Sequence, residues 1–187
     1  MALRCAGIRV EIREISLRDK PPEMLMISPK GTVPVLITDE GIVIDESLDI
    51  MRWALSQHDP FGWLPSAASA EQQEWIRCND TTFKYWLDRY KYAERYPEFD
   101  QNHYRDQAWS CLIERMESHL SKHSFLGGDK PAMSDVTVFP FIRQFASVDS
   151  VWFEANACVA TRQWLKSWLE SEMFKQIMQK HPDTSHL

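Results

Sequence analysis

The chain has 187 residues and a formal net charge of −6 at pH 7, with 44% hydrophobic and 26% charged residues. This length allows one large domain or two small ones, and the apolar content is sufficient for a buried core. No apolar run reaches the roughly 18 residues that a membrane-spanning helix needs, so no membrane partner is expected. The acidic balance, with Lys and Arg scattered among Asp and Glu, argues against nucleic acid as a partner.

The N-terminal residues and the cysteines indicate a cytoplasmic protein. Charged side chains interrupt residues 1–15, so we expect no secretory signal there. The chain has four cysteines, which are far apart and form no C-x-x-C pair: Cys5, Cys78, Cys111 and Cys158. This spacing predicts reduced thiols buried in cores, and it favours neither a disulfide framework nor a zinc site. His119 and His123 have the i, i+4 spacing of a metal pair, but they lack a third ligand at a suitable spacing, so no metal site is expected.

Glycine placement and hydrophobic periodicity divide the chain into a turn-rich first third and a helical remainder. The alternation of Ile8, Val10 and Ile12 with charged residues predicts a half-buried strand. The other elements expected in the first third are the end of a helix at 1–6, a short helix around 23–27, a hairpin of strands at 33–37 and 42–44, and a helix capped by Asp45 that runs to about residue 57.

Residues 58–69, which include Pro60, Gly62 and Pro65, are typical of a linker. The helical period then predicts helices at 70–96, 103–123, 133–147, 158–169 and 171–180. The helix at 133–147 is unusually apolar and is expected to be buried, although Ala132 stands where a Ser or Thr cap would complete a capping box with Asp135. The predicted plan is a small α/β domain of residues 1–57 and an all-helical domain of residues 70–187.

The segment Ser28-Pro29-Lys30-Gly31-Thr32-Val33-Pro34-Val35-Leu36 is a candidate ligand site. Pro34 opens a strand and cannot donate a ladder hydrogen bond. If the Val33–Pro34 bond is cis, the backbone N–H and C=O of Val33 are left free to pair with an extended peptide ligand. The alternative is an ordinary trans proline in a turn, which general frequencies favour.

Two further positions could contact the same ligand. Glu46 and Ser47 lie at a predicted helix N-terminus, where free N–H groups suit a carboxylate and the Glu46 carboxylate suits an ammonium group. Lys20, in a loop, could pair with another carboxylate of the ligand. The simpler interpretations are plain helix capping by Asp45-Glu46-Ser47 and a solvated surface charge at Lys20.

Together these motifs resemble the glutathione transferase superfamily, and in particular bacterial members near its omega-like and glutaredoxin-2-like branches. The resemblance rests on four features: the motif S-P-x-G-x-V-P-V-L, the hairpin, D-E-S at a helix start, and the apolar stretch that begins at Ser134-Asp135-Val136. The resemblance implies a thioredoxin-like N-terminal domain followed by an all-α domain. It also implies that glutathione binds as substrate, with Val33 and Pro34 at its cysteinyl unit, Glu46 and Ser47 at its γ-glutamyl head, and Lys20 at its glycyl end.

The chain departs from this family pattern at its start. Met1-Ala2-Leu3-Arg4-Cys5-Ala6-Gly7-Ile8 resembles the end of the family's first helix, so the first strand and the catalytic residue are expected to be absent. Two explanations remain open: a fragment of a longer protein, or a truncated relative whose sheet is completed by rearranged strands or a partner chain. Cys5 lies at the wrong end of that helix to substitute, so no catalytic residue is assigned.

Two functions are therefore predicted. The first is a glutathione transferase, expected as a homodimer, that conjugates glutathione to an electrophile or reduces a disulfide. The second is a non-catalytic module of the same fold, used for binding or assembly. The aromatic run 86–96 could line a pocket for an apolar co-substrate, or equally pack in a core or a dimer face.

Overall fold

The structure is a computed structural model that describes residues 1–156 and 158–179. The described residues form two compact units. One consists of residues 1–60 together with the described residues from 172 on, and the other of residues 61–171. Among the described residues, no helix has both the length and the apolar character needed to cross a bilayer.

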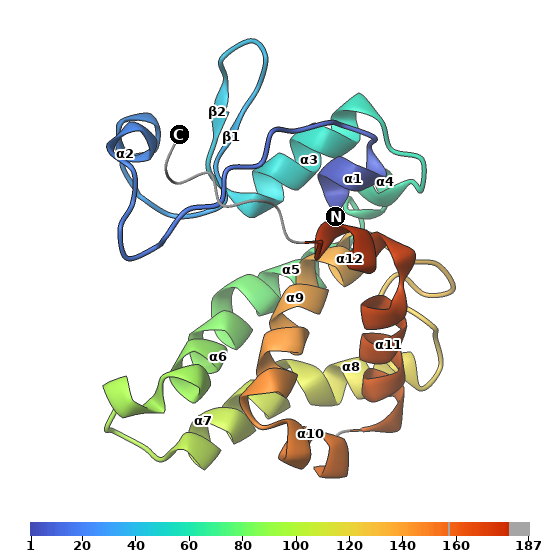
Figure 1. Cartoon of the computed structure of the whole chain (residues 1–187). Helices are drawn as coiled ribbons and strands as arrows, with labels where there is room; N and C mark the ends of the chain where they lie inside the picture. The colour runs from blue at the N-terminus through green and yellow to red at the C-terminus, as the bar shows by residue number, and fades with distance from the viewer. Residues whose placement is uncertain (157, 180–187) are drawn as a thin grey trace. The chain divides into compact units, whose positions relative to one another are not determined.

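The first unit contains a β-hairpin and short helices (Figure 1). Strands β1 (Leu36–Ile37) and β2 (Val43–Ile44) pair antiparallel, with Leu36 opposite Ile44 and Ile37 opposite Val43. This register confirms the predicted hairpin, although both strands are shorter than expected. The helices of this unit are α1 (Ala2–Cys5), α2 (Pro22–Ile27), α3 (Ser47–Gln57) and α12 (Glu172–Ile177). Helix α1 contacts α3 and α12, and Arg4 Nε donates to Gln176 Oε1 at 3.1 Å.

The strand predicted for residues 8–12 is wrong. These residues have no strand assignment, and the side chains of Val10 and Ile12 are 39% and 41% exposed. Alternating apolar residues favour an extended backbone, but a strand also needs a neighbour that satisfies its N–H and C=O groups. Within the described residues, no strand lies alongside this segment to pair with it.

The second unit is all-helical, as predicted. Two of its predicted long helices are present, and each contains a π-helical turn near its middle. The first consists of α5 (Ala70–Cys78), η1 (Asn79–Phe83) and α6 (Lys84–Lys91), followed by a 3-10 turn, η2 (Ala93–Arg95). The second consists of α7 (Gln101–Ala108), η3 (Trp109–Ile113) and α8 (Glu114–Leu120). The other helices are α4 (Trp63–Ser66), α9 (Met133–Val148), α10 (Ser150–Asn156) and α11 (Val159–Glu170).

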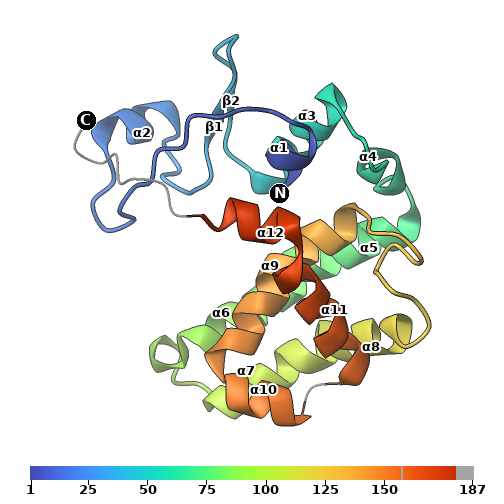
Figure 2. The same ribbon diagram turned by 45° about the vertical axis from the view of Figure 1, so that its right-hand side comes forward.

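Helix α9 is the centre of the helical unit. In Figures 1 and 2 it lies between the α5–α6 helix and α11. Its apolar side chains are buried, as the sequence predicted, at Val136, Val138, Phe139, Ile142 and Phe145. The Phe145 ring alone packs against rings from α6, η1, η3 and α10, which explains how so many aromatic residues are accommodated in one core.

A buried carboxylate fixes the start of α9. Asp135 is fully buried and accepts hydrogen bonds from the backbone N–H groups of Leu126 (2.8 Å), Gly127 (3.0 Å) and Ala132 (2.9 Å). It also accepts one from Trp164 Nε1 at 2.7 Å, so it joins the loop before α9 to α11. Burial raises the pKa of this carboxyl group, while the four N–H donors oppose the rise.

The predicted linker contains a short helix, and the last described helix groups with the N-terminal unit. Residues 63–66, inside the predicted linker 58–69, form α4, and Trp63 is buried. Residues Glu172–Ile177, inside the last predicted helix, group with the N-terminal unit. Residues 180–187 of the predicted helical domain lie outside the described residues.

The cap of α9 gives a stability prediction. Ala132 is its N-cap, and only the Asp135 half of a capping box is present. Ala132→Ser adds a hydroxyl that can accept from the free N–H of the first helical turn, and it should raise the stability by about 1 kcal/mol. Thermal unfolding followed by circular dichroism measures this change. Ala132→Val, which adds bulk without an acceptor, is the control and should give no increase; an unchanged midpoint in Ala132→Ser would contradict the prediction.

Candidate functional site

The hairpin register brings two of the predicted site segments to one place. Because Leu36 lies opposite Ile44, the residues just before β1 and those just after β2 meet at the open end of the hairpin. The strand pairing ends there, and side chains continue the contact: Ser28 Oγ and Lys30 Nζ donate to Asp45, and Lys30 Nζ also donates to Glu46. The segment that leads into β1 and the D-E-S motif at the start of α3 are therefore neighbours in space.

Val33 presents an unpaired backbone at this end of the hairpin. The Val33–Pro34 peptide bond is cis, the less frequent of the two alternatives that the sequence left open. Val33 is 48% exposed, and neither its N–H nor its C=O has a hydrogen-bonding partner among the described residues. A donor and an acceptor side by side on an exposed residue can pair with an extended peptide as a further strand would.

The loop before Val33 also positions Lys20. Gly31 has φ +60°, and a Cβ added to it would lie 3.0 Å from Leu25 Cδ2 and 3.4 Å from Lys20 Nζ. Lys20 thus lies directly against Gly31, two residues from Val33. Its ammonium group has no ion-pair partner among the described residues, so it is available to an anionic ligand.

Glu46 carries an ion pair that the sequence analysis missed. Lys30 Nζ lies 2.9 Å from Glu46 Oε1 and 3.2 Å from Asp45 Oδ1. These hydrogen bonds raise the pKa of Lys30 and lower that of Asp45. Lys30 belongs to the S-P-K-G-T-V-P motif, but its contact with two carboxylates depends on the fold of the loop before β1, which the hairpin pairing does not specify.

Asp45 does not cap α3, which corrects the prediction made for it. Its carboxylate accepts from Ser28 Oγ at 3.2 Å and from Lys30, which direct it back across the hairpin. The N-cap residue is Glu46, and no side chain caps the helix. Ser47 is exposed, and its hydroxyl has no partner among the described residues. The N-terminal turn of α3 therefore offers backbone N–H groups and one hydroxyl to a ligand carboxylate.

The surroundings of the four cysteines disfavour the thiolate form of each side chain. Burial is the largest cause of a raised pKa at Cys5, Cys78, Cys111 and Cys158, and it raises the pKa of Cys111 to about 12. At Cys5 the nearby Asp59 carboxylate raises the pKa further. A nucleophilic cysteine needs the opposite environment, with cations or a helix N-terminus that favour the thiolate.

The other residues singled out in the sequence make contacts within the protein. His119 Nε2 lies 3.1 Å from the carbonyl oxygen of Phe125, and its Nδ1 lies 3.5 Å from Glu71. In the aromatic run, the Arg89 guanidinium lies over the rings of Tyr85 and Tyr96. These contacts favour packing over metal binding for His119, and packing over ligand binding for the aromatic side chains.

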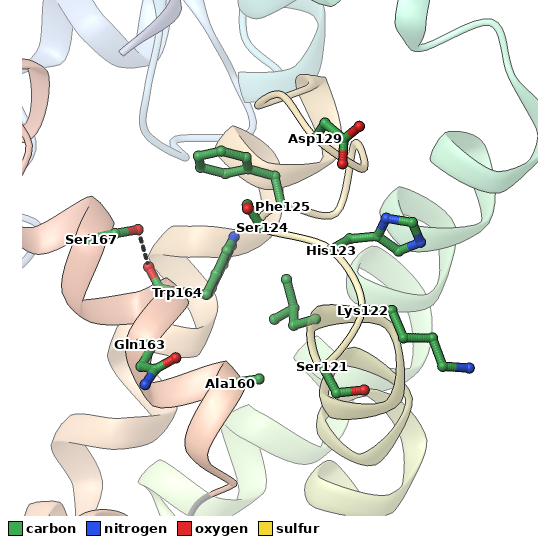
Figure 3. A pocket seen from close by; sticks show the side chains of 11 residues that line it. Ser121, Lys122, His123, Ser124, Phe125, Asp129, Ala160, Gln163, Trp164 and Ser167 are labelled. Carbon is green, nitrogen blue, oxygen red and sulfur yellow. Dashed lines mark hydrogen bonds between the residues drawn. The ribbon is translucent and has the colours of Figure 1, made fainter.

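A cavity of about 450 Å³ lies in the helical unit, between α11 and the loop after α8 (Figure 3). Two of its polar groups are engaged within the protein: Ser167 Oγ donates to the carbonyl oxygen of Trp164, and the Trp164 indole donates to Asp135. Figure 3 shows Lys122 and His123 directed away from Trp164. The cavity therefore lacks the convergent polar groups that the hairpin end provides.

Comparison with known proteins agrees with the fold. A family model for the N-terminal domain of glutathione S-transferases matches residues 1–62. Glutathione S-transferase omega-1 of Mus musculus is 25% identical over 189 residues, which cover 97% of this chain and 73% of that protein. A probable elongation factor 1-gamma 2 of Arabidopsis thaliana is 25% identical over 193 residues, 95% of this chain and 45% of that protein.

Two solved structures share the fold. The bacterial glutathione transferase BphK, solved as a ternary complex, superposes with a TM-score of 0.77 at 19% identity, over 94% of this chain and 88% of that chain. The glutathione transferase URE2P6 of Phanerochaete chrysosporium, in complex with oxidised glutathione, superposes with a TM-score of 0.76 at 20% identity, over 94% and 86%. The chain is therefore similar to glutathione S-transferases in sequence, and it shares their fold, a thioredoxin-like N-terminal domain followed by a helical C-terminal domain.

The Gly31 contact yields a prediction about the loop that positions Lys20. Gly31→Ala should destabilise the protein through its positive φ, by about 1–2 kcal/mol, and through the close approach of Leu25. Gly7→Ala is the matched control, because Gly7 has φ +71° but open space around its Cβ position. Urea unfolding should show a larger loss for Gly31→Ala than for Gly7→Ala. Equal losses would show that the Leu25 contact does not constrain this loop.

Proposed function

We propose that this protein binds glutathione at the open end of the hairpin and uses it either to conjugate an electrophile or to reduce a disulfide. The observation that carries the proposal is the exposed Val33 backbone, which has no partner among the described residues and follows the loop that Ser28 and Lys30 join to Asp45 and Glu46. The match of residues 1–62 to the N-terminal domain of glutathione S-transferases and the complex of URE2P6 with oxidised glutathione support it. The γ-glutamyl-cysteinyl-glycine backbone is an extended peptide with a charged group at each end, which suits this arrangement.

Each end of glutathione has a matching group in the site. The γ-glutamyl carboxylate would accept from Ser47 and the first turn of α3, and its ammonium group would approach Glu46. Because Lys30 already pairs with Glu46, the ligand must share that carboxylate or displace Lys30 toward Asp45. The cysteinyl unit would pair with the Val33 backbone beside Pro34, and the glycyl carboxylate would pair with Lys20.

The reaction follows from this orientation. Binding both ends of glutathione fixes its sulfur relative to the site, so that an electrophile or a disulfide can be attacked without the entropy cost of a free encounter. In a conjugation, the sulfur gives its proton to water and bonds to the electrophilic atom, either by addition to a double bond or by displacing a leaving group that departs with the bonding electrons. In a reduction, the thiolate attacks one disulfide sulfur, forms a mixed disulfide and releases the other sulfur as a thiol; a second glutathione then attacks the mixed disulfide, which releases the second thiol and leaves glutathione disulfide. The chain's own role in this account is to bind and orient glutathione.

A non-catalytic binding or assembly module is the second candidate. The similarity to an elongation factor 1-gamma over 95% of this chain favours it, as do the raised pKa values of all four thiols. Turnover of a generic electrophile by this chain would exclude a purely non-catalytic module.

The proposal also includes a cytoplasmic location, which the four free thiols support. It further includes a homodimer, which analytical sedimentation would test.

Binding measurements test the γ-glutamyl end of the site. Ser47→Ala removes a hydroxyl that would donate to the ligand carboxylate, and it should weaken glutathione binding by about tenfold, as expected for a hydrogen bond to a charged group. Isothermal titration calorimetry gives the affinity. Ser56→Ala, at the other end of α3, is the control and should bind like the unmodified protein. Unchanged affinity in Ser47→Ala would remove Ser47 from the site.

The glycyl end can be tested with a shorter ligand. Lys20→Met should weaken glutathione binding by about tenfold but leave the binding of γ-glutamylcysteine, which lacks the glycyl carboxylate, nearly unchanged. The comparison isolates one ion pair, because both ligands share every other contact. An equal loss for the two ligands would place Lys20 elsewhere in the site or give it a purely structural role.

A further inference from the structure

Two cysteines come together where the two long helices of the helical unit touch. Cys78 is the last residue of α5, directly before the π turn η1, and Cys111 lies within the π turn η3. The turns η1 and η3 are in contact. A π turn widens a helix locally and changes the direction of the side chains around it, and such turns are frequent at functional positions.

The two cysteines are neighbours in space although 33 residues separate them in the chain, and, besides burial, the charge of Cys78 acts on the Cys111 thiol and contributes to its raised pKa. Cys78 Sγ donates to the carbonyl oxygen of Cys111 at 3.2 Å, so the first sulfur lies against the backbone of the second cysteine. Cys111 Sγ donates to the carbonyl oxygen of Ala108 at 3.3 Å. Both residues are partly exposed and both thiols are free. A disulfide requires Cα atoms about 4.4–6.8 Å apart, a spacing that facing turns of contacting helices can provide.

We propose that Cys78 and Cys111 form a pair of neighbouring thiols, which a small-molecule disulfide oxidises to an intramolecular disulfide between the two long helices. One sulfur attacks the reagent disulfide, forms a mixed disulfide and releases one thiol. The second sulfur then attacks the first, closes the protein disulfide and releases the second thiol. The two protein thiols lose two electrons and two protons, which the reagent takes up as it becomes two thiols.

The surrounding charges indicate the order of attack. Burial raises the pKa of both thiols, and that of Cys111 reaches about 12. At Cys78, the guanidinium groups of Arg115 and Arg77 oppose this rise, although Glu74, which binds both of them, adds to it. Cys78 is therefore the sulfur that attacks first, and Cys111 closes the disulfide. The reaction is expected to be slow at neutral pH and faster in mild alkali.

The experiment uses the full chain with Cys5→Ser and Cys158→Ser, so that only the pair remains. This protein is incubated with glutathione disulfide, and its intact mass is measured under denaturing conditions. The expected product lacks two hydrogen atoms and carries no adduct, and its proteolytic digest contains a Cys78–Cys111 linked peptide. The same protein with Cys78→Ser is the control, and it should stop at one glutathione adduct on Cys111 or stay unreacted.

Two results would overturn the proposal. One is a doubly adducted protein without a linked peptide, which would show that the sulfurs cannot meet. The other is no reaction at all at a pH where a denatured sample reacts completely. Circular dichroism establishes that the variants are folded, and peptide mapping of the oxidised, unmodified protein provides the same test without substitutions. In the oxidised protein, the midpoint of thermal unfolding should rise, because the cross-link restricts the unfolded chain.

Discussion

The candidate site depends on the register of one short hairpin. Pairing Leu36 with Ile44 fixes which residues meet at its open end, and a shift by one residue would move every side chain to the other face. The register brings the segment before β1 to the start of α3, and the Lys30 ion pairs with Asp45 and Glu46 join these two segments. The ligand groups are thus assembled by backbone pairing, while the individual side chains remain exposed.

Much of this arrangement could be predicted from the sequence. The hairpin follows from two apolar runs around Asp39-Glu40-Gly41, and the buried helix α9 follows from its uninterrupted apolar side chains. The positions of Val33, Glu46 and Ser47 at one end follow once the hairpin is accepted. The sequence predicts Asp135 as the third-residue member of a capping box whose cap position is Ala132, but the hydrogen bond of Asp135 to Trp164, 29 residues away, depends on tertiary packing that no local pattern specifies.

The predictions that failed depended on strand neighbours and hydrogen-bonding partners that a local sequence pattern does not specify. Ile8, Val10 and Ile12 alternate as a strand should, yet a strand exists only beside another strand, and none of the described residues provides one. Asp45 has the residue type of a helix cap, but Ser28 and Lys30 compete for its carboxylate. The π turns that bring Cys78 and Cys111 together have no sequence signal that the helical period reveals.

The central claim is that glutathione pairs with the backbone of Val33, and the Val33 amide proton reports on it directly. In the free protein this N–H has no acceptor among the described residues, so it should exchange rapidly with solvent. Hydrogen exchange measured by NMR with saturating glutathione should show strong slowing at Val33, with shifts at Glu46 and Ser47. An unchanged Val33 amide, with glutathione-induced shifts confined to the cavity beside Trp164, would contradict the account.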